Sequence, residues 1–232
     1  MIQFNKNLFG IGLLMLSVLF HSCAKEDLVN KEYDSGSTFA ALSVFNAIEG
    51  TENLQVLVDD KIVNKTDENF DTGGYLNYRT VFPGKRKLEL ISPRGHIYYK
   101  NEHDFKASKF YSYFFYGKEN AEKLITEDEL IKPDAGKLKF RVINLVSDSK
   151  IKMEFTYLNA KHSSNFDNRT YGFNDYSYKE SFNFKITSVD GKHQALEIPF
   201  EGKDRSAYTI VIYTDLNEVK TGNELKFKIL EI

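Results

Sequence analysis

The residue types that most often carry chemistry are sparse and scattered in this sequence. Four histidines, His96, His103, His162 and His193, do not have the spacing of a zinc or catalytic site. The chain has a single cysteine, Cys23, so no cysteine pair can complete a metal site. Neither a Gly-x-Ser-x-Gly motif nor a phosphate-binding glycine loop occurs. We therefore expect no metal, no cofactor and no catalytic residues, which predicts a protein that is not an enzyme.

Two acidic runs, Asp59-Asp60 and Glu127-Asp128-Glu129, are the remaining candidates for acid–base chemistry. Glycoside hydrolysis uses two carboxyl groups that face each other across a sugar bond. Adjacent acids at the ends of strands are more often solvated turns. We expect solvated turns at both places.

An aromatic segment at 165–178 has the composition of a binding surface. Rings at Tyr171, Phe173, Tyr176 and Tyr178 lie among amide and acid side chains. Exposed tyrosines stack on sugars or anchor protein partners, although the chain has no tryptophan, which weakens the case for a sugar. The alternative is that these rings form cross-strand pairs that pack a long hairpin. Both interpretations stay open, and the second describes the more common arrangement.

The N-terminus has the features of an export leader. Residues 8–20 are uncharged and mostly apolar, and Lys6 precedes them. This run of about 13 residues suits a signal peptide and is too short for a membrane-spanning helix, which needs about 20. The following Phe20-His21-Ser22-Cys23 resembles the lipobox of bacterial lipoproteins. The resemblance implies cleavage before Cys23 and lipidation of that cysteine, whereas an ordinary secretory leader would leave Cys23 as a spare thiol.

The residues after Cys23 indicate where such a lipoprotein would go. Lys25-Glu26-Asp27 resembles the surface-export signal of Bacteroidota lipoproteins, although a solvated, charged linker has a similar composition. Residues 28–37 have little apolar content and are predicted to form a flexible tether. We therefore expect a protein attached to the outer membrane by lipid and facing the cell exterior.

Charge and composition exclude one partner and favour a ring-rich core. The chain has 31 Lys and Arg against 33 Asp and Glu, and this net charge of −2 gives no electrostatic support for nucleic-acid binding. Aromatic residues make up 14% of the chain, which favours a folded core rich in Phe and Tyr.

The remainder of the chain shows the two-residue period of half-buried strands, clearest at 137–142, 151–157 and 225–229. Each should present one wet face and one buried face. Residues 118–131 are predicted to be a connector with one helical turn. Further strands are expected at 54–58, 75–82, 87–91, 110–116, 182–187, 196–200 and 208–213. The core formed by the later strands is expected to include Leu138, Phe140, Val142, Phe155 and Phe227.

An internal repeat organises these strands. Residues 42–47 parallel 140–145, and residues 109–116 parallel 206–213. The turn-forming residues 133–136 separate the two copies. The predicted fold is all-β, with two tandem antiparallel, immunoglobulin-like β-sandwiches. The predicted parts are a signal peptide (1–22), a tether (23–37), and sandwich domains at 38–133 and 134–232.

The first copy also resembles a known family. Val44-Phe45-Asn46-Ala47 ends its opening strand, Val81-Phe82-Pro83-Gly84 forms a turn before a strand, and Ser108-Lys109-Phe110-Tyr111 begins a late strand. These motifs resemble the bacterial domain of unknown function 4397 family, whose β-sandwich modules often occur in tandem on cell-surface lipoproteins. The second copy has diverged and carries an insertion around 165–178. The resemblance implies no catalytic residues.

The sequence thus predicts a lipid-anchored, non-enzymatic surface protein engaged in binding or adhesion, with an unknown protein or glycan as its partner. The alternative is a glycan-binding accessory subunit of a polysaccharide-uptake complex. Neighbouring genes for a porin-type transporter and glycoside hydrolases would favour the alternative.

Overall fold

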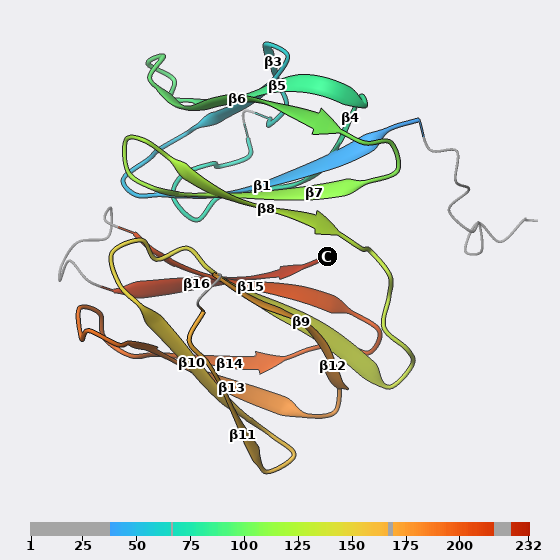
Figure 1. The fold of residues 1–232 in the computed structure, drawn as a ribbon, viewed down its shortest axis with the longest axis vertical. Coiled ribbons are helices and arrows are strands. Elements are labelled where there is room, and N and C mark those ends of the chain that lie inside the picture. The colour runs from blue at the N-terminus through green and yellow to red at the C-terminus, as the bar shows by residue number, and fades with distance from the viewer. Residues whose placement is uncertain (1–37, 66, 167–168, 216–223) are drawn as a thin grey trace, which may run out of the picture. The chain divides into compact units, whose positions relative to one another are not determined.

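The computed structural model describes residues 38–65, 67–166, 169–215 and 224–232, and in these residues the protein is all-β (Figure 1). None of this described part contains a helix long and apolar enough to cross a membrane. The first eight strands form sandwich 1: β1 (Ala40–Ile48), β2 (Gln55–Val58), β3 (Lys61–Ile62), β4 (Tyr75–Val81), β5 (Gly84–Ile91), β6 (Ile97–Phe105), β7 (Phe110–Gly117) and β8 (Glu122–Asp128). The next eight form sandwich 2: β9 (Lys137–Asn144), β10 (Ile151–Tyr157), β11 (Ala160–Ser164), β12 (Thr170–Ser177), β13 (Ser181–Ser188), β14 (Leu196–Glu201), β15 (Ala207–Thr214) and β16 (Leu225–Glu231).

Each sandwich consists of an inner and an outer sheet of four strands. Sandwich 1 has the inner sheet β4-β1-β7-β8 and the outer sheet β3-β2-β5-β6. Sandwich 2 has the inner sheet β12-β9-β15-β16 and the outer sheet β11-β10-β13-β14. Each strand of sandwich 2 occupies the place of the strand numbered eight lower in sandwich 1, so the two sandwiches have the same strand order. The predicted tandem β-sandwich fold is confirmed. The pairing differs from the prediction in one respect, because β1 pairs with β7 and β9 with β15 in parallel.

The repeat extends to individual hydrogen bonds. The side-chain oxygen of Asn46 accepts from the backbone N–H of Ile48 at 3.0 Å, and Asn144 accepts from Val146 at 3.1 Å. Near the other end of each copy, a tyrosine hydroxyl accepts a backbone N–H five residues earlier: Tyr111 from Lys106 and Tyr208 from Lys203. A tyrosine bonded to backbone upstream of it fixes the corner of many β-sandwiches. The two copies therefore share the residues that fix their strand ends.

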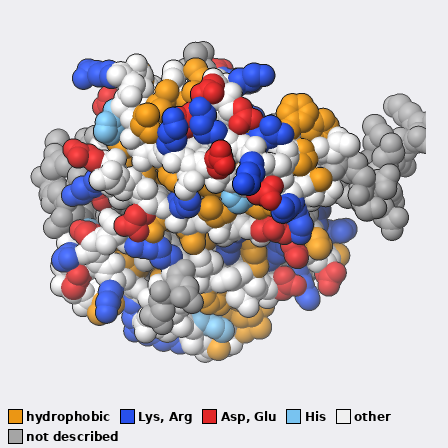
Figure 2. All heavy atoms as spheres, turned by 45° about the horizontal axis from the view of Figure 1, so that its top comes forward, with side chains coloured by type: hydrophobic (Ala, Val, Ile, Leu, Met, Phe, Trp, Pro, Cys, Tyr) orange, Lys and Arg blue, Asp and Glu red, His pale blue; other side chains and the backbone are white. Residues whose placement is uncertain are grey.

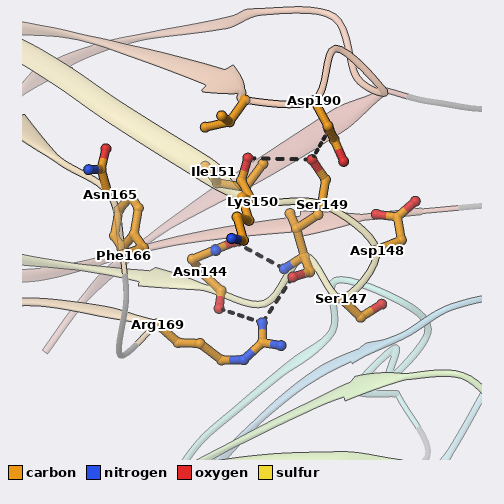
Figure 3. Close-up of a pocket in the computed structure, with 12 residues that line it drawn as sticks. Asn144, Ser147, Asp148, Ser149, Lys150, Ile151, Asn165, Phe166, Arg169 and Asp190 are labelled. Atoms are coloured by element: carbon orange, nitrogen blue, oxygen red, sulfur yellow. Dashed lines mark hydrogen bonds between the residues drawn. The ribbon is translucent and has the colours of Figure 1, made fainter.

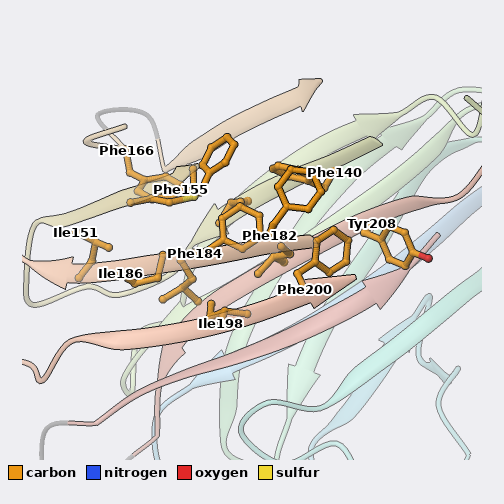
Figure 4. Close-up of a cluster of buried hydrophobic side chains, with 14 of the residues drawn as sticks. Phe140, Ile151, Phe155, Phe166, Phe182, Phe184, Ile186, Ile198, Phe200 and Tyr208 are labelled. Atoms are coloured by element: carbon orange, nitrogen blue, oxygen red, sulfur yellow. The ribbon is translucent and has the colours of Figure 1, made fainter. Parts of the chain in front are cut away.

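Each sandwich has its own apolar core. The core of sandwich 2 is dominated by rings from opposing sheets, with Phe140 on the inner sheet and Phe182, Phe184 and Phe200 on the outer sheet (Figure 4). Of the core residues expected from the sequence, Leu138, Phe140, Val142 and Phe155 are buried there. The expectation for Phe227 is wrong: its side chain is 37% exposed. Phe227 lies on β16, an edge strand of the inner sheet.

A third apolar cluster joins the two inner sheets. It brings Phe45, Ala47, Phe114 and Tyr116 of sandwich 1 together with Ile143, Leu145, Val211 and Leu230 of sandwich 2. Strands of the inner sheets are therefore buried on both faces, which explains the nearly continuous apolar runs of β1, β7 and β15. The predicted wet face of residues 137–142 is corrected by this junction, because Arg141 is only 4% exposed.

Besides β3 and β11, which the sequence did not predict as strands, two segments differ from the strand predictions. Residues 118–131 contain the regular strand β8, which adds to the inner sheet beside β7, in place of the expected connector with a helical turn. Strand β6 is not predicted from the sequence, because its mixed burial shows no two-residue period. The segment between β8 and β9 contains the turn-forming residues 133–136.

Candidate functional site

The residues of the predicted lipid anchor and export signal, Cys23, Lys25, Glu26 and Asp27, lie outside the described residues. The other candidates from the sequence can be placed. They divide into the aromatic segment, the acidic runs and the histidines.

The aromatic segment packs mainly inward. Tyr176 of β12 is only 6% exposed and stacks on Phe140, with ring centroids 4.5 Å apart and planes 7° from parallel. Its hydroxyl lies 2.9 Å from that of Tyr171, and burial together with this hydrogen bond raises the pKa of Tyr176. Tyr171 and Tyr178 are partly buried against the same core. The geometry favours cross-strand packing: the expectation of an exposed ring is wrong for Tyr176, whereas Tyr171 and Tyr178 remain partly exposed.

Phe173 points to the opposite face of β12, toward the junction of the two inner sheets. Its ring lies 4.9 Å from the guanidinium of Arg141, which is also 5.6 Å from the ring of Phe114 in sandwich 1. A cation between two ring faces is favourable. The partly buried ring of Phe173 thus packs on Arg141 within the protein. None of the four candidate rings is fully exposed for stacking on a ligand.

The burial of Tyr176 gives a stability prediction. Replacing Tyr176 by alanine should lower the free energy of unfolding by about 3–5 kcal/mol, because the substitution leaves a cavity beside Phe140. The partly buried Tyr178 is the matched control, and Tyr178→Ala should cost clearly less. Denaturant unfolding of both variants measures the difference. Equal, small losses would contradict a core role for Tyr176.

Asp128, predicted as part of a solvated turn, is instead buried at the junction. Its carboxylate accepts from Nη1 of Arg141 at 2.5 Å and from the hydroxyl of Tyr78 at 2.6 Å. Ser112 also donates to it, and Nε of Arg141 donates to the hydroxyl of Thr209 at 2.8 Å. Burial acts to raise the pKa of Asp128, but the neighbouring Arg141 charge and the hydrogen bonds outweigh it and lower the pKa. This ion pair is a polar connection between the sandwiches.

The other acidic run behaves as expected. Asp59 and Asp60 form the turn between β2 and β3, with positive φ angles of 49° and 64°. They form ion pairs with Arg86 and Lys87 of β5. Asp60 is exposed, and its hydrogen bond from Lys87 lowers its pKa. Both residues stabilise a solvated turn.

The histidines do not converge. Nε2 of His193 lies 2.8 Å from Oδ1 of Asp148, whereas His103 is surrounded by the rings of Phe105, Tyr111 and Tyr113. Burial lowers the pKa of His103. Among the residues that the structure describes, no group of three or more His, Cys, Asp and Glu side chains could hold a metal ion.

A pocket that the sequence did not reveal lies at one end of sandwich 2, with a volume of about 670 Å³ (Figure 3). It is formed where β9 ends at Asn144, by the loop to β10, by Asn165, Phe166 and Arg169, and by the turn between β13 and β14. Polar side chains dominate the labelled lining in Figure 3, with Phe166 and Ile151 behind them. The lining residues are Asn144, Val146, Ser147, Asp148, Ser149, Lys150, Ile151, Asn165, Phe166, Arg169, Val189 and Asp190.

Two of the pocket's loops are fastened to each other. Asp190, in the β13–β14 turn, accepts hydrogen bonds from the hydroxyls of Ser149 and Ser188, and these bonds hold the pKa of Asp190 well below its usual range. The backbone N–H of Val189 donates to the carbonyl of Lys150 at 2.8 Å. The Asp148–His193 contact joins the same two loops. These two loops are therefore fastened to each other before any ligand arrives, which reduces the entropy lost on binding.

Arg169 supports the opposite side of the pocket. Its Nη1 donates to the carbonyls of Val146 at 2.9 Å and Asn144 at 3.4 Å. Its guanidinium also lies 4.4 Å from the ring of Tyr116 in sandwich 1. Arg169 thus links the pocket to the junction.

The pocket is lined by charged and polar groups of both signs. Carboxylates (Asp148, Asp190), cations (Lys150, Arg169) and an amide (Asn165) line it, and these groups suit a polar ligand. Ser149 hydrogen bonds to Asp190, which is a turn-stabilising contact, and His193 contacts Asp148.

The comparisons with known proteins give one family match. Residues 40–150 match the model of the family described as Domain of unknown function (DUF4397). Through this segment the chain belongs to the DUF4397 family. The match covers sandwich 1. It also includes β9 of sandwich 2 and the loop after β9 that lines the pocket, so the matched residues lie on both sides of the junction. The resemblance drawn from the turn and strand motifs is confirmed.

Searches for further relatives gave weak matches for this DUF4397 protein. No curated protein matches it in sequence. The tip fimbrial protein Mfa3 from Porphyromonas gingivalis, with a C-terminal truncation, is 11% identical with a TM-score of 0.27, over 84% of this chain and 99% of Mfa3. The family CBM26 module of Eubacterium rectale Amy13K, solved in complex with maltoheptaose, is 11% identical with a TM-score of 0.25, over 84% of this chain and 97% of the module.

Proposed function

We propose that this protein is a lipid-anchored lipoprotein of the outer membrane that faces the cell exterior and binds a partner without catalysing a reaction. The sequence around Cys23 supports the anchor and the export. The observation that carries the binding role is the polar pocket of sandwich 2, whose rim is pre-formed by the bonds of Asp190, Ser149 and Ser188.

The position of the pocket supports this role. Strand β1, where the described chain begins, starts at the right of Figure 1, whereas β9 ends toward its left. The pocket lies at this far end of β9. A tether at the start of β1 would leave the pocket open to the surroundings, as a binding module on a cell surface requires.

A glycan-binding subunit of an uptake complex remains the alternative, and the pocket gives it less support. Sugar sites usually offer an exposed aromatic face on which a ring can stack. The aromatic residue among the described lining, Phe166, is only 6% exposed. A protein or peptide partner that presents polar groups therefore fits better.

Site-specific crosslinking tests this proposal. A photo-crosslinking amino acid at the exposed Ser147 should trap a partner protein on intact cells, because Ser147 lines the pocket. The exposed Lys179 is the matched control position. It lies near the start of β9, where Tyr178 bonds to Gly136, and should yield little adduct. Lys150→Glu should reduce the Ser147 adduct several-fold by reversing one charge in the lining.

Two outcomes would count against the proposed protein partner. Equal adducts at positions 147 and 179 would mean that the protein is captured by chance contact. If position 147 gives no adduct and the purified protein is retained on a glycan array in a manner sensitive to Lys150→Glu, the partner is a glycan and the alternative holds.

A further inference from the structure

An aromatic pair is exposed at the end of sandwich 1 where the described chain begins. Phe82, in the turn between β4 and β5, is 66% exposed, and Phe39, just before β1, is 42% exposed. Their ring centroids are 5.5 Å apart. We call Phe39, Phe82, Lys85, Lys106 and Lys109 the tether-end patch. Two adjacent exposed rings form an apolar surface whose contact with water is unfavourable.

The two rings are held in place by the backbone around them. The carbonyl of Phe39 accepts the N–H of Ser108 at 2.8 Å, which ties it to the β6–β7 turn. Arg86 stabilises the turn at Phe82. Its Nε donates to the carbonyl of Phe82 at 3.1 Å, and its Nη2 donates to the carbonyl of Pro83 at 2.7 Å. The patch is therefore a pre-formed surface.

Three exposed lysines lie on the segments next to the rings. Lys85, Lys106 and Lys109 are exposed, and their strands or turns adjoin the aromatic pair: Lys85 follows the Phe82 turn, and Lys106 and Lys109 flank Ser108. Lys106 and Lys109 also form ion pairs with Asp104 and Glu127. Figure 2 shows hydrophobic side chains at the upper right of the molecule with basic and acidic side chains beside them. Aromatic rings and long basic side chains are the residues that occupy membrane interfaces.

The length of chain before Phe39 brings this patch close to a membrane. Residues 24–38 separate Phe39 from Cys23. About 15 residues span at most ~50 Å when fully extended, and a flexible chain of that length has an end-to-end distance of roughly 20 Å. Such a tether gives the patch a high effective concentration at the lipid surface, so that even a weak contact would be populated.

We propose that the tether-end patch docks on the membrane that holds the lipid anchor, with Phe39 and Phe82 in the headgroup region and the lysines beside the lipid phosphates. This inference rests on the proposed lipid anchor. It adds a second attachment point, which would orient sandwich 1 on the membrane and direct the pocket away from it.

The absence of natural tryptophan permits a direct test. Phe82→Trp introduces a unique fluorophore at the patch, and Val189→Trp, at a residue that is 63% exposed against 66% for Phe82, is the matched control in the pocket turn. The chain from Cys23 onward keeps the entire compact unit of residues 36–232. Its single thiol can be coupled to maleimide lipid in vesicles of phosphatidylethanolamine and phosphatidylglycerol. This coupling supplies the anchor whether or not cells acylate Cys23.

Docking predicts that the tryptophan emission of the Phe82→Trp variant shifts to shorter wavelength on coupling and is quenched by lipids that carry bromine near the headgroup. The Val189→Trp variant should show neither change. Adding Phe39→Ser to Phe82→Trp should lower the ratio of docked to undocked protein, obtained from the quenching, roughly tenfold, because it removes one of the two rings.

Three results would overturn the proposal. If coupling leaves the emission of the Phe82→Trp variant unchanged, the patch stays in water. If the emission is already shifted before coupling, and the shift does not depend on protein concentration, residues 24–38 cover the patch. A shift that grows with protein concentration without vesicles shows that a second copy covers it. Mass spectrometry of the cellular protein decides acylation separately, so failure of the anchor is distinguishable from failure of docking.

Discussion

Replacing Cys23 by alanine is expected to leave the protein without acyl chains and to convert it from a membrane-bound form to an uncleaved or soluble one. Several acyl chains at about 0.8 kcal/mol per buried methylene hold a lipoprotein lastingly, and the apolar run at 8–20 is too short to replace them. Ser22→Ala is the matched control and should preserve both acylation and membrane attachment. Mass spectrometry of the mature N-terminus and fractionation of cells provide the measurements.

The export signal can be tested separately from the lipid. Replacing Lys25, Glu26 and Asp27 together by alanine should preserve acylation and leave the protein on the periplasmic side, where protease added to intact cells does not reach it. The natural protein should be digested under the same conditions. Surface exposure is refuted if the natural protein resists protease on intact cells yet is digested after lysis.

Breaking the buried ion pair at the junction is the second change with a large expected effect. Asp128→Asn should lower the free energy of unfolding by about 3–5 kcal/mol, because it leaves the Arg141 charge buried without its partner. For a protein of this size, that corresponds to a fall in Tm of roughly 10 °C. The neighbouring Glu127→Gln is the matched control. Glu127 forms a half-exposed pair with Lys109, and its loss should cost less than about 1 kcal/mol.

A double replacement separates charge from packing. Asp128→Leu combined with Arg141→Met removes both buried charges and should recover much of the lost stability. Calorimetry of the single and double variants measures this recovery. If the Asp128→Asn variant were as stable as the Glu127→Gln variant, the Asp128–Arg141 ion pair would not hold the sandwiches together.

The same pair predicts a dependence of stability on pH. The folded-state pKa of Asp128 is lowered relative to the unfolded chain, so its contribution is fully present above the unfolded value of about 3.9 and is lost as the pH falls through the lower folded value. The acid-induced loss should be smaller in the Asp128→Asn variant. Tm measured between neutral and strongly acidic pH tests the difference.

The sequence predicted what depends on local pattern. Two-residue periods located most strands, and the parallels between 42–47 and 140–145 predicted that β1 and β9 are equivalent. The repeat held because Asn46 and Asn144, and Tyr111 and Tyr208, make the same backbone bonds in both copies.

What escaped prediction depends on tertiary neighbours. Arg141 alternates with apolar residues like any solvated strand residue, and only the packing of one inner sheet on the other buries it. The burial of Asp128 escaped prediction for the same reason, because its partner Arg141 belongs to the other sandwich. Phe227 has the correct period but lies on an edge strand. The pocket is made of three separate parts of the chain whose proximity no local pattern encodes.

The parallel pairing within each inner sheet also constrains when this protein can fold. Ser43 of β1 and Ser112 of β7 bond across 69 residues, and Arg141 of β9 and Thr209 of β15 across 68. Contacts between such distant residues form slowly, because the intervening loop must close first. A chain that crosses a membrane with its N-terminus leading cannot complete the first inner sheet until β7 has emerged, nor the second until β15 has. If the chain is exported as we propose, the strand order would keep each sandwich unfolded until its parallel partner strand has crossed, and an unfolded chain is the state that an export channel can carry.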